Sequence, residues 1–449
     1  MAPNLDPAVE RLPVDERRTL QGQRLRDLVA RLDAVDTPWW QGKLADVDAT
    51  AIRSVDDLAR LPFTVKAEFR EQYPFGMLAV PLEDTVRVHA SSGTSGKPTI
   101  VAYTAHDIEL FAEVNARALR CAGALPQHVI HVAYGYGLFT GGLGLHYGVE
   151  ALGATAVPAG GGNTAFQTTL LADLGATGLC ATPSFAMLLA ERAAADGVAG
   201  IGLRWGVFGA EPWSEGMRAK LESAWSAVTG APFDACDIYG LSEVIGPGVA
   251  QEAPQSKGAL FVFDDHFLPE IVDPDTGDPV ADGSHGELVL TTLTKQAQPV
   301  LRYRTGDVTR FVDDHCPSGR THRRIERLKG RVDDMLVIRG VNVFPKEIEA
   351  VLMDDAAVGA QYAVVIDERA TLQRLEVRGE LTSADDLTRL EAVQDRLERA
   401  LASRLRLSVD VRLAGPGQMP RQETGKAQRV FRWAADQPDP YPVQAVSSA

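Results

Sequence analysis

The stretch SSGTSGKPTIVAYT (residues 91–104) joins a loop of hydroxyls, glycines and one lysine to a proline and an apolar, strand-like run. Backbone N–H groups and hydroxyls of such a loop can surround a polyphosphate that arrives with a metal ion. A P-loop is excluded, because only two residues separate Gly93 from Gly96 where that motif has four, and Pro98 follows the lysine. Proline disfavours the start of a phosphate-capping helix at this place. Clusters of Gly, Ser and Thr are more often plain turns, so other motifs in the chain are needed to distinguish a turn from a phosphate loop.

Length and charge narrow the class of protein. The chain has 449 residues, which at ~100–200 residues per domain predicts two or three structural units. Lys and Arg number 45 against 60 Asp and Glu, a formal charge of -15. This charge would repel nucleic acid and acidic membrane surfaces, so a phosphate ligand needs a local binding site. We therefore expect neither nucleic acid nor a membrane among the partners.

Targeting signals and disulfides are not expected. The first residues, MAPNLD, contain neither a basic segment nor an apolar one, and we find no apolar run long enough to span a bilayer. A cytoplasmic location is the resulting expectation. The four cysteines, Cys121, Cys180, Cys236 and Cys316, form no C-x-x-C pair, so we expect reduced thiols.

Helical and strand-like segments alternate along most of the chain. Apolar residues at helical spacing predict a helix over residues 16–33 and another after residue 107, with Asp107 as its N-cap. The runs VIHVAYGYG, LRWGVFGAE, FDACDIYG and HGELVLTTL are typical of strands that end near glycine. This alternation predicts an α/β fold with layered sheets and helices, and with ligand groups at strand ends.

A second unit is predicted near the C-terminus. The strand-like pattern restarts with MLVIRGVNVFP (residues 335–345), and a long amphipathic helix follows. That helix is predicted from apolar residues spaced by three or four positions, namely Leu387, Leu390, Val393, Leu397 and Leu401. We expect a large domain over residues 1–329, a hinge over residues 330–334 and a small domain over residues 335–449.

Five further stretches share the polar, glycine-rich character of the opening loop. They are GAEPW (209–213), DIYGLSE (237–243), YRTGD (303–307), GRVDDMLVIRG (330–340) and ETGKAQR (423–429). In this order they resemble the signature set of the acyl-adenylate-forming superfamily. The longer stretches AYGYGLFTGGLGLHYG, DIYGLSEVIGPGVA, LRYRTGDVTR and GRVDDMLVIRGVNVFPKEIE resemble the phenylacetate–CoA ligase family in particular.

The resemblance implies a two-step reaction. ATP and a carboxylate would give acyl-AMP and pyrophosphate, after which a thiol displaces AMP. The implied fold is a large N-terminal adenylate-forming domain plus a small, mobile C-terminal α+β domain that carries a catalytic lysine. The first step brings two anions together and needs cations, which the family takes from Mg²⁺ and lysines.

Residue roles follow from the matching motifs. Glu243 would hold Mg²⁺, a role that suits a hard oxygen ligand. Lys97 would lie near the polyphosphate, and Lys426 would bridge the carboxylate and the α-phosphate. Asp333 would be the hinge about which the small domain rotates between the two steps. A solvated loop glutamate and an ordinary exposed lysine are the alternatives for Glu243 and Lys426.

The same motifs supply an ATP site. Asp307 would accept both ribose hydroxyls, Tyr239 would lie against the adenine, and Arg331 would donate to ribose or phosphate. The implied nucleotide-binding residues are Ser91, Ser92, Gly93, Thr94, Ser95, Gly96, Gly209, Ala210, Glu211, Asp237, Ile238, Tyr239, Gly240, Ser242, Asp307 and Arg331. Outside these motifs, a buried aromatic for Tyr239 and a linker for Arg331 would be the usual interpretations.

The acyl pocket is implied by the segment YGYGLFTGG and the residues after Glu243. Its members would be Tyr136, Phe139, Thr140, Gly141, Ile245 and Gly246. Two aromatic rings beside small glycines make a flat apolar slot that suits an aryl ring better than an alkyl chain. Core positions for Tyr136 and Phe139 remain an open alternative, and His146 is expected to be a core histidine.

The chain departs from its relatives at a cysteine-rich cluster. Gln251, Ala253 and Ser318 stand where relatives carry cysteines, whereas Cys316 and His266 remain. Two ligands do not complete a tetrahedral site, so we expect no zinc. The segment LQRLEVRGEL (residues 372–381) also differs, which leaves the contacts to the acyl acceptor open.

The sequence therefore predicts an ATP-dependent, AMP-forming ligase for an aromatic carboxylic acid, with coenzyme A as acceptor and Mg²⁺ as metal. One alternative passes the aryl-AMP to an amine, a hydroxyl or a carrier protein. Another is a catalytically silent nucleotide-binding protein, which would not need the complete ionic set of Lys97, Glu243, Asp307, Arg331 and Lys426. The partners are expected to be small molecules, and the protein a monomer or homodimer.

Overall fold

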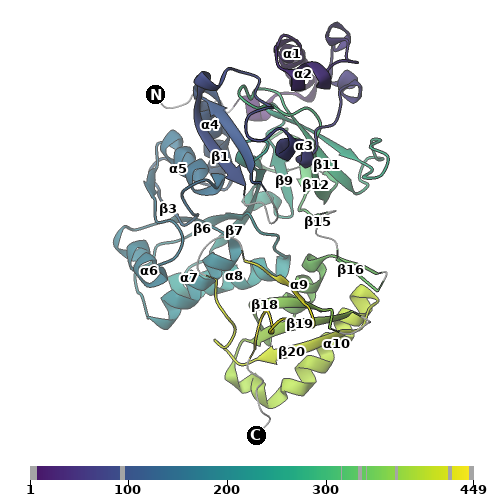
Figure 1. Cartoon of the computed structure of the whole chain (residues 1–449). Helices are drawn as coiled ribbons and strands as arrows, with labels where there is room; N and C mark the ends of the chain where they lie inside the picture. Colours follow the sequence, from purple (N-terminus) through teal and green to yellow (C-terminus); the bar gives the residue numbers. More distant parts are fainter. Residues whose placement is uncertain are drawn as a thin grey trace.

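The computed structural model describes residues 8–91, 97–314, 316–331, 336–339, 341–369, 373–422 and 427–443. Its helices are α1 Val14–Asp33, α2 Pro38–Lys43, α3 Lys66–Glu71, α4 Ala105–Cys121, α5 Thr140–Leu152, α6 Thr164–Asp173, α7 Pro183–Ala195, α8 Glu215–Thr229, α9 Pro345–Asp354 and α10 Leu390–Leu405. Figure 1 shows two parts, a large one that ends near β15 and a smaller one below it that begins at β16.

The large part contains strands β1 to β15. They are β1 Thr85–Ser91, β2 Thr99–Thr104, β3 Val129–Val132, β4 Thr155–Val157, β5 Gly178–Ala181, β6 Trp205–Gly209, β7 Asp234–Leu241, β8 Gly246–Glu252, β9 Ala259–Val262, β10 Phe267–Val272, β11 Gly286–Thr292, β12 Tyr303–Thr309, β13 Phe311–Val312, β14 Arg324–Glu326 and β15 Gly330–Arg331. The four strand-like runs singled out in the sequence coincide with β3, β6, β7 and β11, so these predictions are confirmed.

A nine-stranded sheet in the order β13-β14-β9-β8-β7-β6-β5-β3-β4 forms the centre of the large part. Strands β4, β3, β5, β6 and β7 are parallel, and helices α5 to α8 lie between them in the chain. Strands β5 and β6 are wholly buried, as expected for parallel strands covered on both faces. The carboxyl ends of β6 and β7 meet at one edge, which brings the GAEPW and YGLSE motifs together. The predicted α/β fold is confirmed.

Two smaller sheets complete the large part. Strands β1 and β2 pair around the phosphate-loop segment, and β10, β11, β12 and β15 form an antiparallel sheet. In that sheet Asp307 of β12 lies directly opposite Arg331 of β15. The YRTGD motif and the first residues after the large domain are thus neighbours through strand pairing.

The smaller part contains the strands β16 Leu336–Ile338, β17 Val341–Val343, β18 Val358–Asp367, β19 Arg374–Leu381, β20 Val409–Ala414 and β21 Val430–Trp433, together with helices α9 and α10. Strands β16 and β17 form a two-stranded sheet, and the others form a mixed sheet in the order β20-β19-β18-β21. Helix α10 buries Val393, Leu397 and Leu401. The predicted long amphipathic helix is confirmed, although it begins at Leu390, and Leu387 lies in the preceding 3-10 turn.

The N-terminal ends of two predicted helices need comment. The first helix runs over Val14–Asp33, close to the predicted residues 16–33. The second begins at Ala105, and its cap is Thr104, whose hydroxyl accepts the Asp107 N–H; the prediction of Asp107 as N-cap is wrong. Asp107 instead occupies position N3 of the helix and completes a capping box, because its carboxylate accepts the Thr104 N–H. The sequence pattern Thr-x-x-Asp does not reveal this arrangement by itself, because the end of β2 at Thr104 must also be known.

The two parts pack through α8 and α9. An added Cβ at Gly216 of α8 would lie 2.6 Å from the Cβ of Met353, so glycine permits the close approach of the helices. The Lys220 ammonium donates to the carbonyls of Val358 at 2.7 Å and Asp355 at 3.3 Å. Figure 1 shows the smaller part lying against α7 and α8 of the larger one.

The structure bears on the expected absence of membrane spans and of disulfides. Within the described ranges, no helix is long and apolar enough to cross a membrane. The four cysteines are buried and free, as predicted.

Candidate active site

Three of the predicted nucleotide residues form one connected group. The Tyr239 hydroxyl donates to Asp307 Oδ2 at 2.6 Å, and Arg331 Nη1 donates to Asp307 Oδ1 at 3.2 Å. Asp307 is 4% exposed, and burial together with its carboxylate raises the pKa of Tyr239 well above the ordinary value. The phenol therefore stays protonated and keeps the carboxylate in a defined orientation.

The GAEPW backbone approaches β7 closely. An added Cβ at Gly209 would lie 2.4 Å from the Ile238 carbonyl oxygen, so only glycine fits there. The Gly209 N–H donates to the Tyr134 hydroxyl at 2.9 Å, and Ala210 adopts a φ of +69°, in the left-handed region that costs a non-glycine residue free energy. Strain of this kind is typical of backbone that lines a ligand site.

The rest of the YGLSE region is also held by close backbone packing. An added Cβ at Gly240 would lie 2.0 Å from the Gly246 carbonyl oxygen, at a register shift between β7 and β8. The Asp237 carboxylate already has a partner in the protein, because Arg327 Nε donates to it at 2.7 Å. Ser242 is buried, with its hydroxyl 3.4 Å from that of Thr140.

Glu243 is a buried carboxylate with an open oxygen. It is 4% exposed, and among the described residues its Oε1 has no hydrogen-bond partner. Because the described residues offer this buried oxygen no hydrogen-bond partner, a cation close to it would offset the cost of burying its charge. A hard divalent ion such as Mg²⁺ fits this donor.

Two lysines near Glu243 were not singled out from the sequence. Lys66 Nζ, at the start of α3, lies 3.7 Å from Glu243 Oε1. Lys295 is fully buried and donates to the Glu243 carbonyl oxygen at 3.3 Å, and burial lowers its pKa to about 8 against the attraction of Asp107 and Glu243. Both are far from Glu243 in the chain, and no local pattern marks them, so only the fold could bring them together.

The predicted acyl residues lie around the start of α5. Tyr136 is 37% exposed, so a core position is excluded, and its hydroxyl lies 3.3 Å from His146 Nδ1. An added Cβ at Gly141 would lie 2.4 Å from the Phe139 ring, and at Gly246, where φ is +113°, one would lie 2.8 Å from Thr140. The glycines thus leave room for rings and side chains that a larger residue would displace.

Ile245, another predicted acyl-pocket residue, follows Glu243 by two positions. It is fully buried, and its carbonyl oxygen accepts the Tyr103 hydroxyl at 2.9 Å. Lys295 lies over the Tyr103 ring at 5.1 Å. Tyr103 and Lys295 therefore hold the backbone of residues 243–245 from beneath.

The phosphate loop falls largely outside the described residues, which exclude Ser92, Gly93, Thr94, Ser95 and Gly96. Ser91 ends β1, and its buried hydroxyl has no hydrogen-bond partner within the described part of the chain. Lys97 is exposed and lies 5.0 Å from the centre of the Tyr73 ring.

The predicted hinge and catalytic lysine also lie outside the described residues, since neither Asp333 nor Lys426 is among them. The next residue, Ala427, is described. Its N–H donates to Glu211 Oε1 at 2.7 Å. Ala427 is therefore joined by a hydrogen bond to the GAEPW motif of the large part.

The region of the missing cysteine cluster holds other contacts. Cys316 Sγ lies 3.3 Å from the Ser318 hydroxyl, and His266 Nδ1 lies 2.8 Å from the Thr294 hydroxyl. Asp264, Asp265 and His322 come within 4.8 Å of one another. Arginines bind both carboxylates, so this cluster resembles an ion-pair network more than a metal site. The expectation of no zinc stays a prediction.

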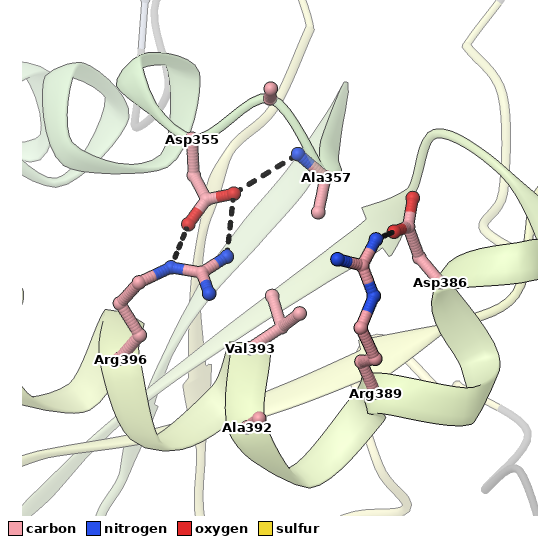
Figure 2. A pocket seen from close by; sticks show the side chains of 8 residues that line it. Asp355, Ala357, Asp386, Arg389, Ala392, Val393 and Arg396 are labelled. Atoms are coloured by element: carbon pink, nitrogen blue, oxygen red, sulfur yellow. Dashed lines mark hydrogen bonds and ion pairs between the residues drawn. The ribbon is translucent and has the colours of Figure 1, made fainter.

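A pocket of about 380 Å³ lies in the smaller part and is shown in Figure 2. Its lining includes Arg396, which binds Asp355 at 2.7 and 3.0 Å, and Arg389, which binds Asp386 at 2.5 Å. Because both arginines are paired with carboxylates, the pocket lacks the surplus positive charge that an anionic nucleotide requires. None of its residues belongs to the predicted site.

The contacts of Asp307, Glu211 and Glu243 involve residues that the resemblance to adenylate-forming enzymes singles out. Family models match residues 28–293 as AMP-binding enzyme and residues 340–432 as AMP-binding enzyme C-terminal domain. Phenylacetate-coenzyme A ligase of Thermus thermophilus is 45% identical over 95% of this chain and 98% of its own. The chain belongs to the AMP-binding enzymes, within the phenylacetate–CoA ligase family.

Solved structures agree with this assignment. 2-Hydroxyisobutyryl-CoA ligase in the postadenylation state, in complex with R3-HIB-AMP, is 27% identical, with a TM-score of 0.87 over 95% of this chain and 91% of that one. The same ligase in the thioesterification state, with 2-HIB-AMP and CoA, has 28% identity and a TM-score of 0.70 over 95% and 92%. The present structure thus resembles the first arrangement more closely.

Proposed function

We propose that this AMP-forming ligase activates an aromatic or arylacetic acid as its acyl-AMP and transfers the acyl group to coenzyme A. The observation that carries the proposal is the open, buried carboxylate of Glu243, with Lys66 3.7 Å away and the acyl-pocket residues beside it. The likeness to a phenylacetate-coenzyme A ligase over 95% of the chain supports the acid class and the acceptor.

The chain's own residues would bind and orient the two anions. Asp307 would accept the ribose hydroxyls while Tyr239 and Arg331 hold its carboxylate in place. Lys97 would approach the polyphosphate from the loop after β1, and Lys66 would add positive charge near Glu243. Placing donors where charge builds up in the transition state is the largest catalytic term in such reactions.

Mg²⁺ belongs to this proposal through Glu243. The ion, when bound, would neutralise charge on the phosphates and polarise them towards attack. Glu243 would hold it through Oε1, which has no hydrogen-bond partner among the described side chains and only a long ion pair with Lys66. Lys295, which donates to the Glu243 carbonyl oxygen, would keep the backbone of this ligand in place.

The acyl pocket is proposed to hold an aryl ring. Tyr136 and Phe139 would supply aromatic faces, and the absence of a side chain at Gly141 makes room for the Phe139 ring. Tyr136 is exposed enough to contact a ligand, unlike the fully buried Tyr103 beneath the site. Aromatic rings pack favourably against one another in offset or edge-on geometry.

We further propose that residues 330–334 act as a hinge and that the small domain changes position between the two half-reactions. The higher TM-score against the postadenylation state supports an arrangement poised around acyl-AMP formation. The contact between Ala427 and Glu211 supports a position of the lysine segment close to the nucleotide motifs.

The function is tested by screening aromatic and aliphatic acids for pyrophosphate release, with and without CoA, and identifying the products by mass spectrometry. Phenylacetate with CoA is expected to give the thioester. Release with aliphatic acids only would exclude the aryl proposal. Accumulation of aryl-AMP that CoA does not consume would favour an amine, a hydroxyl or a carrier protein as acceptor.

The role of Lys426 is tested by its alanine variant in the separate half-reactions. Lys426→Ala is expected to slow aryl-AMP formation by roughly 10²–10³, because one donor to the developing charge is lost. Thioester formation from supplied aryl-AMP and CoA should remain largely intact. An equal fall in both half-reactions would assign Lys426 a structural role and remove the main support for domain rotation.

A further inference from the structure

We propose that the Glu211 side chain, together with Ser184 and Arg429, is a latch that holds the Lys426 segment in position for acyl-AMP formation. Glu211 is thereby a positioning residue that acts through its carboxylate, in addition to the backbone role of the GAEPW motif. This inference rests on the proposed function, because it concerns the first of the two half-reactions.

The Glu211 carboxylate has partners on both parts of the molecule. Oε1 accepts the Ala427 N–H at 2.7 Å, from the small part. Oε2 accepts the Ser184 hydroxyl at 2.7 Å and the Ser184 N–H at 3.3 Å, from the start of α7 in the large part. Each carboxylate oxygen thus serves one side of the interface.

Arg429 closes the latch from the small part. Its Nη2 donates to the Ser184 hydroxyl at 2.9 Å, and its Nη1 donates to the Tyr362 carbonyl oxygen at 3.0 Å. The guanidinium also lies 4.6 Å from the centre of the Tyr362 ring. Ser184 is therefore held between a carboxylate of its own part and a cation of the other.

A second contact keeps the same interface in register. Glu349 of α9 accepts the Ser214 N–H at 2.6 Å through Oε1 and the Tyr362 hydroxyl at 2.7 Å through Oε2. Tyr362 lies beneath Arg429, so the two contacts share one side chain. The interface is polar and directional here, in contrast to the apolar packing of α8 on α9.

The position of the latch in the chain explains its function. Ala427 follows Lys426 directly, and consecutive Cα atoms are about 3.8 Å apart. Anchoring the Ala427 N–H therefore restricts the place from which the lysine can reach the reacting carboxylate. Glu211 follows Gly209 and Ala210, whose backbone is assigned to the adenine, so one short motif would position both nucleotide and lysine.

The test measures acyl-AMP formation and thioester formation separately in Glu211→Ala, Glu211→Gln and wild type. Glu211→Ala is expected to lower the kcat of acyl-AMP formation about tenfold, the loss of one charge-assisted hydrogen bond at the lysine segment. The KM for ATP should stay within about twofold, and thioester formation from supplied phenylacetyl-AMP should be unchanged or faster. Glu211→Gln keeps an acceptor oxygen and should recover most of the loss.

Glu191→Gln is the matched control. Glu191 lies on α7, like Ser184, and forms an ion pair with Arg421 of the smaller part at 3.5 Å. Within the described part of the chain, no hydrogen bond or ion pair joins Glu191 to a residue of the latch. It should leave both half-reactions unchanged. Arg429→Gln should lower acyl-AMP formation in the same way as Glu211→Ala but less, because it weakens the Arg429–Ser184 contact and keeps the Glu211–Ala427 contact.

The outcomes separate the latch from simpler explanations. A raised KM for ATP in Glu211→Ala would show that the residue acts on the nucleotide, and an equal fall in both half-reactions would show a structural role. No change in either half-reaction would also overturn the latch. Failure of the wild-type enzyme to form any aryl-AMP would instead contradict the proposed function.

Discussion

Two groups of buried carboxylates in this protein differ in how they are paired. Asp264 and Asp265 are each 1% exposed and have close cationic partners, including Arg17 at 2.8 Å and Arg117 at 3.0 Å. Glu243 is 4% exposed, yet its Oε1 has only Lys66 at 3.7 Å among the described residues. The two aspartates are thus paired with arginines at hydrogen-bond distance, whereas the Glu243 carboxylate has only a long ion pair within the described residues.

The difference separates stability from function. The aspartates link α1 and α4 to the β9–β10 turn, because Arg17 comes from α1 and Arg117 from α4. Burial alone would raise the pKa of Asp265, but the charges of His266 and Arg117 hold it well below its usual value. An ionised carboxylate with full pairing stabilises the fold, whereas an open one leaves a site for a cation.

The largest expected effect is on Glu243. Glu243→Gln should abolish aryl-AMP formation, a fall of at least about 10³, because an amide is a poor ligand for a hard cation. The melting temperature should stay the same or rise, since a poorly compensated buried charge is removed. Both are checked by pyrophosphate release at saturating Mg²⁺ and by calorimetry. Unchanged turnover would show that Glu243 is not the ligand.

The opposite pattern is expected at the paired aspartates. Asp265→Asn removes the nearest carboxylate partner of the buried Arg117 and leaves only its longer ion pairs with Glu10 at 3.4 Å and Glu113 at 3.5 Å. This loss should cost up to about 3–5 kcal/mol in the free energy of unfolding. The remaining folded enzyme should keep a near-normal KM for ATP. Chemical denaturation gives the first quantity and steady-state kinetics the second. Equal destabilisation by Glu243→Gln would remove the distinction between the two groups.

The pH dependence of stability follows from the same pairs. The folded pKa values of Asp264 and Asp265 are depressed, so their contribution is present above their unfolded values near 4 and is lost as the pH falls through the folded values. Burial also lowers the pKa of His322, whose contribution is lost below its unfolded value of about 6.5. We expect stability to fall by about 1–3 kcal/mol between pH 7 and pH 4 through His322, and to fall further below pH 4 as the two aspartates become protonated.

This expectation is measured by thermal melts from pH 7 down to about pH 2. Below pH 4 the Asp265→Asn variant should show a shallower decline than the wild type, because one of the titrating carboxylates is gone. A variant curve parallel to that of the wild type would place the acid sensitivity elsewhere in the protein.

The smallest expected effect concerns the apolar side of the open site. Tyr136→Ala should raise the KM for the aryl acid about tenfold, the cost of one lost contact surface, with the KM for ATP unchanged. Tyr103→Phe is a useful comparison, because Tyr103 is fully buried and its hydroxyl holds the Ile245 carbonyl oxygen. If Tyr136→Ala weakened ATP use equally, Tyr136 would be structural.

Local patterns in the sequence were sufficient for many elements. The spacing of Leu25, Leu28, Val29 and Leu32 predicted α1, and glycine-ended apolar runs predicted β3, β6, β7 and β11. These signals are reliable because amphipathic periodicity reports on burial of one face within a single segment. The cap of α4 was misassigned by three residues, because Thr and Asp are both common N-cap residues and only the structure shows that the helix begins directly after Thr104.

By itself, the sequence determined the α/β class, the order of the motifs and the family resemblance, since each is written in contiguous residues. Only the tertiary structure decided that Lys66 and Lys295 lie beside Glu243, that Asp107 accepts N–H groups from residues 296 and 297, and that Glu211 contacts Ala427. These contacts join residues up to about half the chain length apart. Their energies depend on burial and on which strands neighbour one another, and neither quantity is encoded in any local pattern.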